Sequence, residues 1–393
     1  MISNDNFCDT LQEHGVTFVA GVPCSYFSGP IERLTREGKY LPAANEGAAL
    51  AAAAGASVAG RRSAVIAQNS GLGNLINPLT SLVQTYGIPV LVFMSLRGWP
   101  DPSEDEPQHA VMGTATHKLL DAVGVPHITV PADATELGSA LDRAEEHLAA
   151  RRSVFVLAQK GAIESHRPEA HPVVTGVSRV EVLRAIEPLL GDAAVVSTTG
   201  YTSRELFGVT GSKNHFYMQG SMGHAAAFAL GVALQSTARP VVVLDGDGAA
   251  IMHLGTLSSV GACAPAGLVH LVFDNGTYES TGGQATTSHS TDFAGVARSV
   301  GYVSAQECRS VDEVTAALAK ALRSSGPHLI VAKVAGGGTS TFSRATAAMT
   351  TDEIRDGFAA RLETEHRSGE ASLTNSHVDP SAPAVRPPGR DRP

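Results

Sequence analysis

Short runs of apolar, largely β-branched residues alternate with Ala-rich or amphipathic stretches along most of this chain of 393 residues. Ser63–Ala67 and Val241–Leu244 are two of the apolar runs, and Glu46–Ala59 and Ala249–Cys263 are two of the stretches with helical character. Apolar strands separated by helices are typical of βαβ units, in which a parallel sheet is buried on both faces. The pattern therefore predicts an α/β fold of mostly parallel sheets with helices on both faces.

The alternation occurs in two blocks with an irregular segment between them. Gly161–Gly176 is rich in His, Pro and Glu and has no apolar period, which indicates a linker. We place the boundary near Val174, so that residues 1–173 form one domain and residues 174–365 the other. Ser, Pro, Arg and Asp dominate from His366 to Pro393, and this composition predicts a disordered tail.

Charge and hydropathy exclude several classes of protein. The 29 Lys and Arg residues against 38 Asp and Glu residues give a formal charge of -9 without a basic run, which argues against a nucleic-acid partner. The sequence shows neither a targeting segment nor an apolar run long enough to cross a membrane. Its four cysteines lack the spacing of a metal or redox motif, so we expect reduced thiols. A soluble, cytoplasmic protein without a membrane partner is predicted.

Polar residues follow two neighbouring predicted strands. Gly246-Asp247-Gly248 comes just after Val241–Leu244, and Asp274-Asn275-Gly276-Thr277 ends the next strand. The carboxyl ends of parallel strands meet at the edge where open α/β sheets bind ligands. Carboxylate and amide oxygens suit Mg²⁺, while glycines and a helix beginning near Ala249 suit a phosphate. Gly-Asp-Gly alone is also compatible with an ordinary strand-to-helix turn, but the pair at this interval favours a metal-diphosphate site.

This pair of motifs resembles the metal and diphosphate motif of thiamine-diphosphate (ThDP) enzymes, with Asp274 in place of the first of two asparagines. The resemblance implies Mg²⁺ ligands and diphosphate contacts in the second domain. The implied metal ligands are the side chains of Asp247 and Asn275 and the backbone carbonyl of Thr277. The implied cofactor contacts in this region are Gly246, Gly248, Ala249, Asn275 and Tyr278.

The resemblance also implies a catalytic acid in the first domain, and Glu46 in the segment Pro42–Ala49 matches it. In this family the acid hydrogen-bonds the pyrimidine ring of ThDP and activates the cofactor. By itself, Glu46 is equally an ordinary first-turn residue stabilised by the helix dipole. Two further turns resemble segments that hold the pyrimidine, one with Gly220, Ser221 and Met222, the other with Asn69 and Gly71.

The linker is too short for a third domain, and nearly the whole chain resembles the phosphonopyruvate and sulfopyruvate decarboxylases. The resembling segments include Gly21–Ser25, Asp105–His109 and Ser197–Leu206. The resemblance implies a lyase that converts 3-phosphonopyruvate to phosphonoacetaldehyde and CO₂ in phosphonate biosynthesis. Sulfopyruvate or another 2-oxo acid is the alternative substrate.

The same resemblance implies a homodimer or larger homo-oligomer with active sites at the subunit interface, where Glu46 of one chain meets Asp247 of its partner. His109 is a candidate for proton transfer or a structural histidine. Tyr278 stands where the subfamily usually has a histidine, which leaves its effect on the substrate open. An anionic phosphonate needs cationic donors, and the candidates remain open among Arg97, Lys118, Lys160 and Arg204.

Two other classes remain to be distinguished. A nucleotide-dependent dehydrogenase needs a GxGxxG turn after the first strand, and Gly21-Val22-Pro23-Cys24 does not provide one. A non-catalytic ThDP-binding protein is suggested by Asp274 and Tyr278, although Glu46 and Asp247 are both present. Cofactor binding without CO₂ release is the behaviour that identifies this last class.

Overall fold

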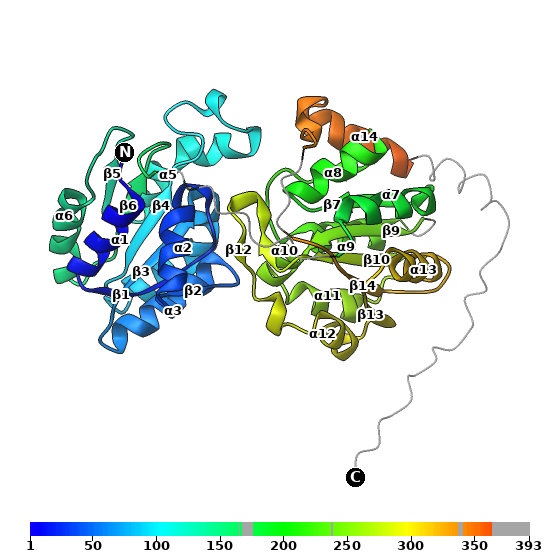
Figure 1. The fold of residues 1–393 in the computed structure, drawn as a ribbon, viewed down its shortest axis with the longest axis horizontal. Coiled ribbons are helices and arrows are strands. Elements are labelled where there is room, and N and C mark those ends of the chain that lie inside the picture. The colour runs from blue at the N-terminus through cyan, green and yellow to red at the C-terminus, as the bar shows by residue number, and fades with distance from the viewer. Residues whose placement is uncertain (165, 167–175, 237–238, 337–340, 364–393) are drawn as a thin grey trace, which may run out of the picture.

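The computed structural model describes residues 1–164, 166, 176–236, 239–336 and 341–363. Two lobes lie side by side, each with a central sheet between layers of helices (Figure 1). This arrangement confirms the predicted α/β class. The proposed boundary at Val174 and the tail from His366 fall outside the described residues.

The first lobe contains a six-stranded sheet in which every strand pairs in parallel. The strand order is β2-β1-β3-β4-β6-β5. Successive strands are therefore added on one side of β1 first and then on the other side, and the order reverses between β1 and β3. The strands are β1 (Val16–Gly21), β2 (Tyr40–Pro42), β3 (Arg62–Gln68), β4 (Leu91–Ser95), β5 (His127–Val130) and β6 (Val154–Ala158). The helices are α1 (Asn4–Glu13), α2 (Ser28–Arg36), α3 (Glu46–Val58), α4 (Leu72–Pro78), α5 (Ala110–Ala122) and α6 (Gly138–Ala149).

Successive strand residues point to opposite faces of this sheet and build two separate cores. Ile66 and Phe93 pack with α1, α2 and α6 on one face. Val65 and Val92 pack with α3, α4 and α5 on the other face. The sequence shows continuous apolar runs rather than an alternating pattern because both faces are buried.

The second lobe repeats this plan with strand order β13-β14-β10-β9-β7-β8, again fully parallel, and the direction reverses between β7 and β9. A separate antiparallel pair joins β11 and β12. The strands are β7 (Ala194–Ser197), β8 (Phe216–Tyr217), β9 (Val241–Gly246), β10 (Leu268–Asp274), β11 (Thr277–Tyr278), β12 (Gln284–Ala285), β13 (Ser304–Cys308) and β14 (His328–Lys333). The helices are α7 (Arg179–Leu190), α8 (Tyr201–Thr210), α9 (Ala225–Gln235), α10 (Asp247–Met252), α11 (Thr256–Cys263), α12 (Phe293–Val300), α13 (Val311–Ala321) and α14 (Thr351–Glu363).

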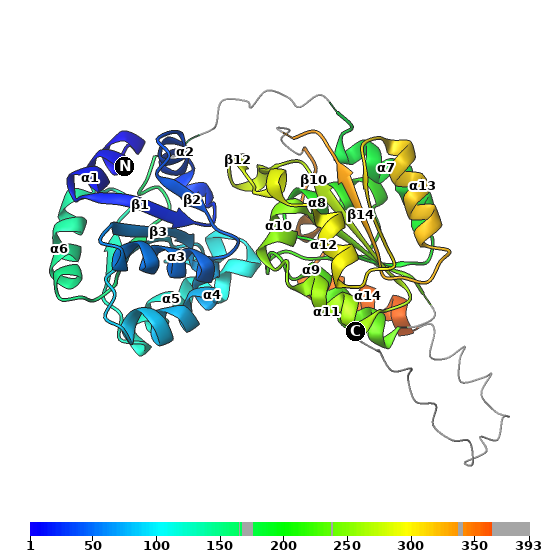
Figure 2. The ribbon, with the colours of Figure 1, turned by 90° about the horizontal axis from the view of Figure 1, so that it is seen from below.

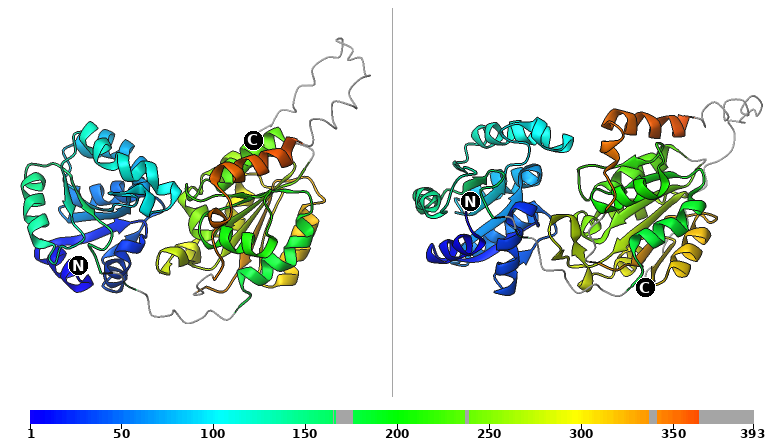
Figure 3. Two further views of the ribbon diagram at one scale, coloured as in Figure 1. Left: turned by 90° about the horizontal axis from the view of Figure 1, so that it is seen from above. Right: turned by 45° about the horizontal axis from the view of Figure 1, so that its top comes forward.

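The structure differs from the prediction in several elements of the second lobe, and α8 and the β11–β12 pair are among those that were not expected. The helix expected over Ala249–Cys263 is two helices, because α10 ends at His253, whose backbone leaves the helical region. The edge strand β13 has three exposed polar residues among its five and therefore has no apolar run. The unpredicted helix α14, orange in Figure 3, packs on the edge strand β8, and its Phe358 ring contacts Phe216 and Phe228.

The lobes meet through polar contacts at the ends of their helices. Asn45 caps α3 by accepting a hydrogen bond from Ala48 N through Oδ1, and its Nδ2 donates to the carbonyl of Met252 at the end of α10, at 3.2 Å. Glu106 of the first lobe forms an ion pair with Arg344 of the second. Figure 2 shows β12 facing α2 across the same boundary. The carboxyl edges of the two sheets are thereby brought to one region.

Candidate functional site

A cleft of about 690 Å³ lies between the lobes, near the ends of β3, β4, β7 and β8. In both sheets it lies close to the point where the strand order reverses, which is where open α/β sheets bind ligands. Residues of both lobes line it. The predicted site residues among them are Glu46, Gly71, His109, Gly220, Ser221 and Met222.

Glu46 begins α3 and is 5% exposed. Burial raises the pKa of its carboxyl, and a hydrogen bond from Asn74 Nδ2 to Oε2 at 2.7 Å opposes this rise. Gly71 lies against the same carboxyl, since a Cβ at this position would come within 2.2 Å of Oε1. The site thus holds one carboxyl oxygen by an amide and keeps the other next to a residue without a side chain.

The turn between β8 and α9 has an unusual backbone that favours its residue types. Ser221 has φ of +54° and Gly223 has φ of +86°. A Cβ at Gly223 would lie 2.7 Å from the ring of His253, and one at Gly220 would lie 3.1 Å from Cβ of Gln108. Glycine at both ends therefore lets this turn approach α10 and the first lobe closely, with Met222 lining the cleft between them.

Asp247 is the first residue of α10 and is 2% exposed. Burial raises its pKa to about 6, although the hydroxyl of Thr286 donates to Oδ2 and lowers it. Among the described residues, no Lys or Arg pairs with this carboxylate. The local chemistry therefore leaves the buried negative charge of Asp247 without a cationic side chain.

The other predicted metal ligands lie in the turn from β10 to β11. Asn275 Oδ1 accepts a hydrogen bond from Thr277 N at 3.0 Å, and the hydroxyl of Thr277 is buried without a hydrogen-bond partner. In the described parts of the chain, no three His, Cys, Asp or Glu side chains gather to hold a metal. A set of one carboxylate with amide and backbone oxygens suits Mg²⁺, which usually keeps water or phosphate as further ligands. The residues present thus fit magnesium and a diphosphate.

Tyr278 and the metal-motif glycines do not line the cleft itself. The ring of Tyr278 packs beside Gly248, where a Cβ would lie 2.4 Å from Cε1. Burial raises the pKa of Tyr278, and the charges of Asp247 and Glu46 add to this effect. A Cβ at Gly246, by contrast, would meet nothing within 4 Å, so this glycine faces open space. The predicted contact Ala249 is buried in α10.

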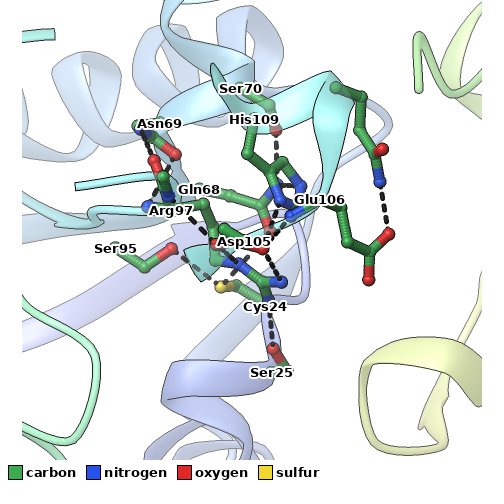
Figure 4. Close-up of polar contacts among 12 residues, drawn as sticks. Cys24, Ser25, Gln68, Asn69, Ser70, Ser95, Arg97, Asp105, Glu106 and His109 are labelled. Atoms are coloured by element: carbon green, nitrogen blue, oxygen red, sulfur yellow. Dashed lines mark hydrogen bonds and ion pairs between the residues drawn. The ribbon is translucent and has the colours of Figure 1, made fainter. Parts of the chain in front are cut away.

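A polar network surrounds His109 in the first lobe, as Figure 4 shows. Asp105 accepts two hydrogen bonds from Arg97, each at 2.9 Å, and one from His109 Nδ1 at 2.9 Å. Burial alone would raise the pKa of Asp105, but the hydrogen bonds from Arg97 and His109 lower it well below its usual range. His109 Nε2 lies 3.5 Å from Gln68 Nε2. Asp105 therefore fixes both the guanidinium and the imidazole ring.

One predicted cofactor contact is placed differently from the expectation. Asn69 is fully buried and does not line the cleft; its side chain binds both the backbone N–H and the carbonyl of Arg97. Within one chain, Asn45 ties the start of α3, which carries Glu46, to the end of α10, which begins with Asp247. That Glu46 of one chain meets Asp247 of its partner stays a prediction. Asn69 thus orients the backbone that carries Arg97.

Three site residues were missed from the sequence. Asn74 lies inside the turn that resembles the pyrimidine-binding segment, but nothing in its spacing pointed to Glu46. Thr286 and Arg344 lie in segments without a motif, and only the fold brings them to Asp247 and Glu106. No signal in the sequence could have identified these last two.

The chain matches two models of thiamine pyrophosphate enzymes. The N-terminal TPP-binding domain matches residues 3–130, and the C-terminal TPP-binding domain matches residues 197–332. In the described residues, no helix is long and apolar enough to cross a membrane.

Curated relatives extend over most of the chain. A phosphonopyruvate decarboxylase of Streptomyces viridochromogenes is 45% identical over 80% of this chain and 84% of its own length. A phosphonopyruvate decarboxylase of Streptomyces hygroscopicus is 44% identical over 88% of this chain and 90% of its own length. A sulfopyruvate decarboxylase of Methanosarcina acetivorans is 26% identical over 71% of this chain and 77% of its own length. The chain belongs to the phosphonopyruvate decarboxylase family of thiamine-pyrophosphate enzymes.

Proposed function

We propose that this protein decarboxylates 3-phosphonopyruvate to phosphonoacetaldehyde and CO₂ with ThDP and Mg²⁺. The identity of 44–45% to two phosphonopyruvate decarboxylases over most of their length carries this proposal. The sulfopyruvate relative is less similar and makes sulfopyruvate the second choice of substrate. When bound, ThDP supplies the electron sink that loss of CO₂ from a 2-oxo acid requires.

Glu46 is proposed to hold the proton that activates the cofactor. Its raised pKa keeps a proton on the carboxyl at higher pH than an exposed glutamate would, so that Oε1 can donate to a ring nitrogen. Asn74 fixes Oε2, and Gly71 leaves room for this orientation. The role of the chain at this point is to aim one oxygen and to exclude water from it.

The diphosphate and its metal are proposed to bind at Asp247, Asn275 and the carbonyl of Thr277. The uncompensated buried carboxylate of Asp247 and the unpartnered hydroxyl of Thr277 support this assignment. Thr286 orients the Asp247 carboxylate through its hydroxyl. Gly246 leaves open space where a phosphate can approach the backbone.

His109 is proposed to move the proton that the product requires. It lines the cleft, and Asp105 holds its Nδ1, so Nε2 is the atom left to exchange a proton. Replacement by Gln should lower kcat for aldehyde release while the affinity for ThDP stays the same.

The proposed function is tested by measuring CO₂ and aldehyde formation from phosphonopyruvate and sulfopyruvate with ThDP and Mg²⁺. Phosphonopyruvate should have the higher kcat/KM, and Glu46→Gln should reduce it by roughly 10²–10⁴-fold. Faster turnover of sulfopyruvate would reject the substrate, and ThDP binding without CO₂ release would reject the activity.

We also propose that the chain forms a homodimer through α9. This helix is apolar on nearly all sides, and Ala227, Gly231 and Leu234 are exposed on its outer face. Light scattering should give twice the chain mass, and Leu234→Glu should give the monomer. Mixing Glu46→Gln with Asp247→Ala then tests where the site is built. Activity should recover in part, because a mixed dimer holds one site with both residues intact, whereas no recovery would place Glu46 and Asp247 of one site on the same chain.

A further inference from the structure

Among the residues that the structure describes, three arginines line the cleft, and they come from both lobes. Arg97 follows β4 of the first lobe, Arg204 lies in the second turn of α8, and Arg344 precedes the last helix of the second lobe. None of the three belongs to the residues proposed to hold the metal or the cofactor. Their common position shows that the cleft carries a cationic region in addition to its cofactor residues.

The three guanidinium groups differ in how far carboxylates neutralise them. Arg97 uses Nε and Nη2 to bind Asp105, and its Nη1 is 3.5 Å from Ser25 Oγ. Arg344 forms an ion pair with Glu106. In the part of the chain that the structure describes, Arg204 has no carboxylate partner, and its guanidinium lies 5.3 Å from the centre of the Tyr201 ring.

The three charges lie close enough to influence one another. Burial lowers the pKa of Arg344, and the charges of Arg204 and Arg97 lower it further, whereas Glu106 opposes the change. Like charges gathered in a partly buried cleft repel one another unless an anion separates them. The arrangement is therefore one that an oxyanion would stabilise.

The other two cationic candidates from the sequence have no place in this cluster. Lys118 in α5 and Lys160 after β6 are exposed, and neither lines the cleft. The structure thus distinguishes candidates that the sequence left open. It also adds Arg344, which no motif had pointed to.

We propose that Arg97, Arg204 and Arg344 bind the phosphonate group of the substrate, with Arg204 as its main direct contact. This assignment rests on the proposed function, because it concerns the end of phosphonopyruvate that does not react. A phosphonate presents three oxygens and carries negative charge. Guanidinium groups bind such oxyanions through paired, charge-assisted hydrogen bonds. Asp105 keeps Arg97 in a fixed orientation, which reduces the entropy lost on binding.

The test uses 3-phosphonopropanoate, which has the phosphonate but no keto group and cannot react. Its binding to the enzyme loaded with ThDP and Mg²⁺ is measured by calorimetry. Arg204→Met should weaken this binding by about 10- to 100-fold, in line with the loss of a charged hydrogen bond, and Arg204→Lys should weaken it less. Lys118→Met is the matched control and should bind the analogue like the wild type.

Kinetics separate this inference from the proposed function. Arg204→Met should raise KM for phosphonopyruvate while its affinity for ThDP remains that of the wild type. Unchanged analogue binding and KM in both Arg204→Met and Arg344→Met, in an enzyme that decarboxylates phosphonopyruvate, would overturn the arginine site alone. Failure of the wild-type enzyme to release CO₂ from phosphonopyruvate would instead overturn the proposed function.

Discussion

Replacing Gly71 by Ala should disable Glu46 without unfolding the chain. The backbone accepts the change, because Gly71 has φ of -83° and ψ of -3°. The new Cβ would lie 2.2 Å from Oε1 of Glu46, whereas ordinary contacts begin near 3.4 Å. The carboxyl must therefore move by about 1.2 Å, and a displacement of about 1 Å can cost roughly 10²-fold in rate.

Stability should change much less than activity. The clash involves Oε1, Cδ and Cγ of one side chain, and rotating this side chain away from the new Cβ mainly loses the hydrogen bond from Asn74, about 1 kcal/mol. Gly55→Ala is the matched control, because Gly55 lies in the same helix as Glu46 and a Cβ there meets nothing within 4 Å. It should keep full activity and stabilise the chain by about 0.5–1 kcal/mol.

The assay measures kcat of CO₂ release together with urea unfolding of each variant. If Gly71→Ala acts through the acid, it should add little to the defect of Glu46→Gln, since both changes remove the same group. Full activity in Gly71→Ala, or additive losses in the double variant, would refute this reasoning.

Arg179 is buried between Glu205 and Glu279. Arg179→Met should therefore lower the free energy of unfolding in urea by about 3–5 kcal/mol, because it leaves two buried carboxylates unpaired. An unchanged urea midpoint would contradict a structural role for Arg179. Burial lowers the pKa of His215 to about 4, against 6.5 for the unfolded chain. The unfolded state therefore binds a proton first as pH falls from 6.5 to 4, and stability should drop by up to about 3 kcal/mol across this window. His215→Phe should reduce that slope, and a slope equal to the wild type would exclude His215 as its source. Asp247→Ala should weaken ThDP binding in saturating Mg²⁺ by at least about 10-fold by calorimetry, and equal affinity would remove Asp247 from the metal site.

The layered fold was predictable because its strands are buried on both faces and its helices carry local apolar patterns. Val241–Leu244 shows this directly, since every residue in it is buried against a helix layer. The edge strand Ser304–Cys308 was missed because three of its five residues are exposed and polar, so it resembles a loop in the sequence. The break between α10 and α11 falls at His253 and Gly255, inside a segment whose other residues have helical character.

The site was predictable only where chemistry is encoded in neighbouring residues. Gly246-Asp247-Gly248 and the start of α3 at Glu46 could be found because strand and helix ends have short, recognisable patterns. Arg344 could not be found, because its proposed role depends on its position beside Arg97 and Arg204, which lie far from it in the sequence. Charge clusters assembled by the fold are not visible until distances in space are known.

The side chain of Asn45 makes two contacts that serve different parts of the site. One side-chain amide starts the helix that carries Glu46 and also holds the segment that begins with Asp247. Any motion that parts the two lobes must break the hydrogen bond from Asn45 Nδ2 to Met252, whereas the bond from Ala48 N to Asn45 Oδ1 can remain. The helix that carries Glu46 is therefore anchored to the second lobe by a bond that can break without uncapping the helix.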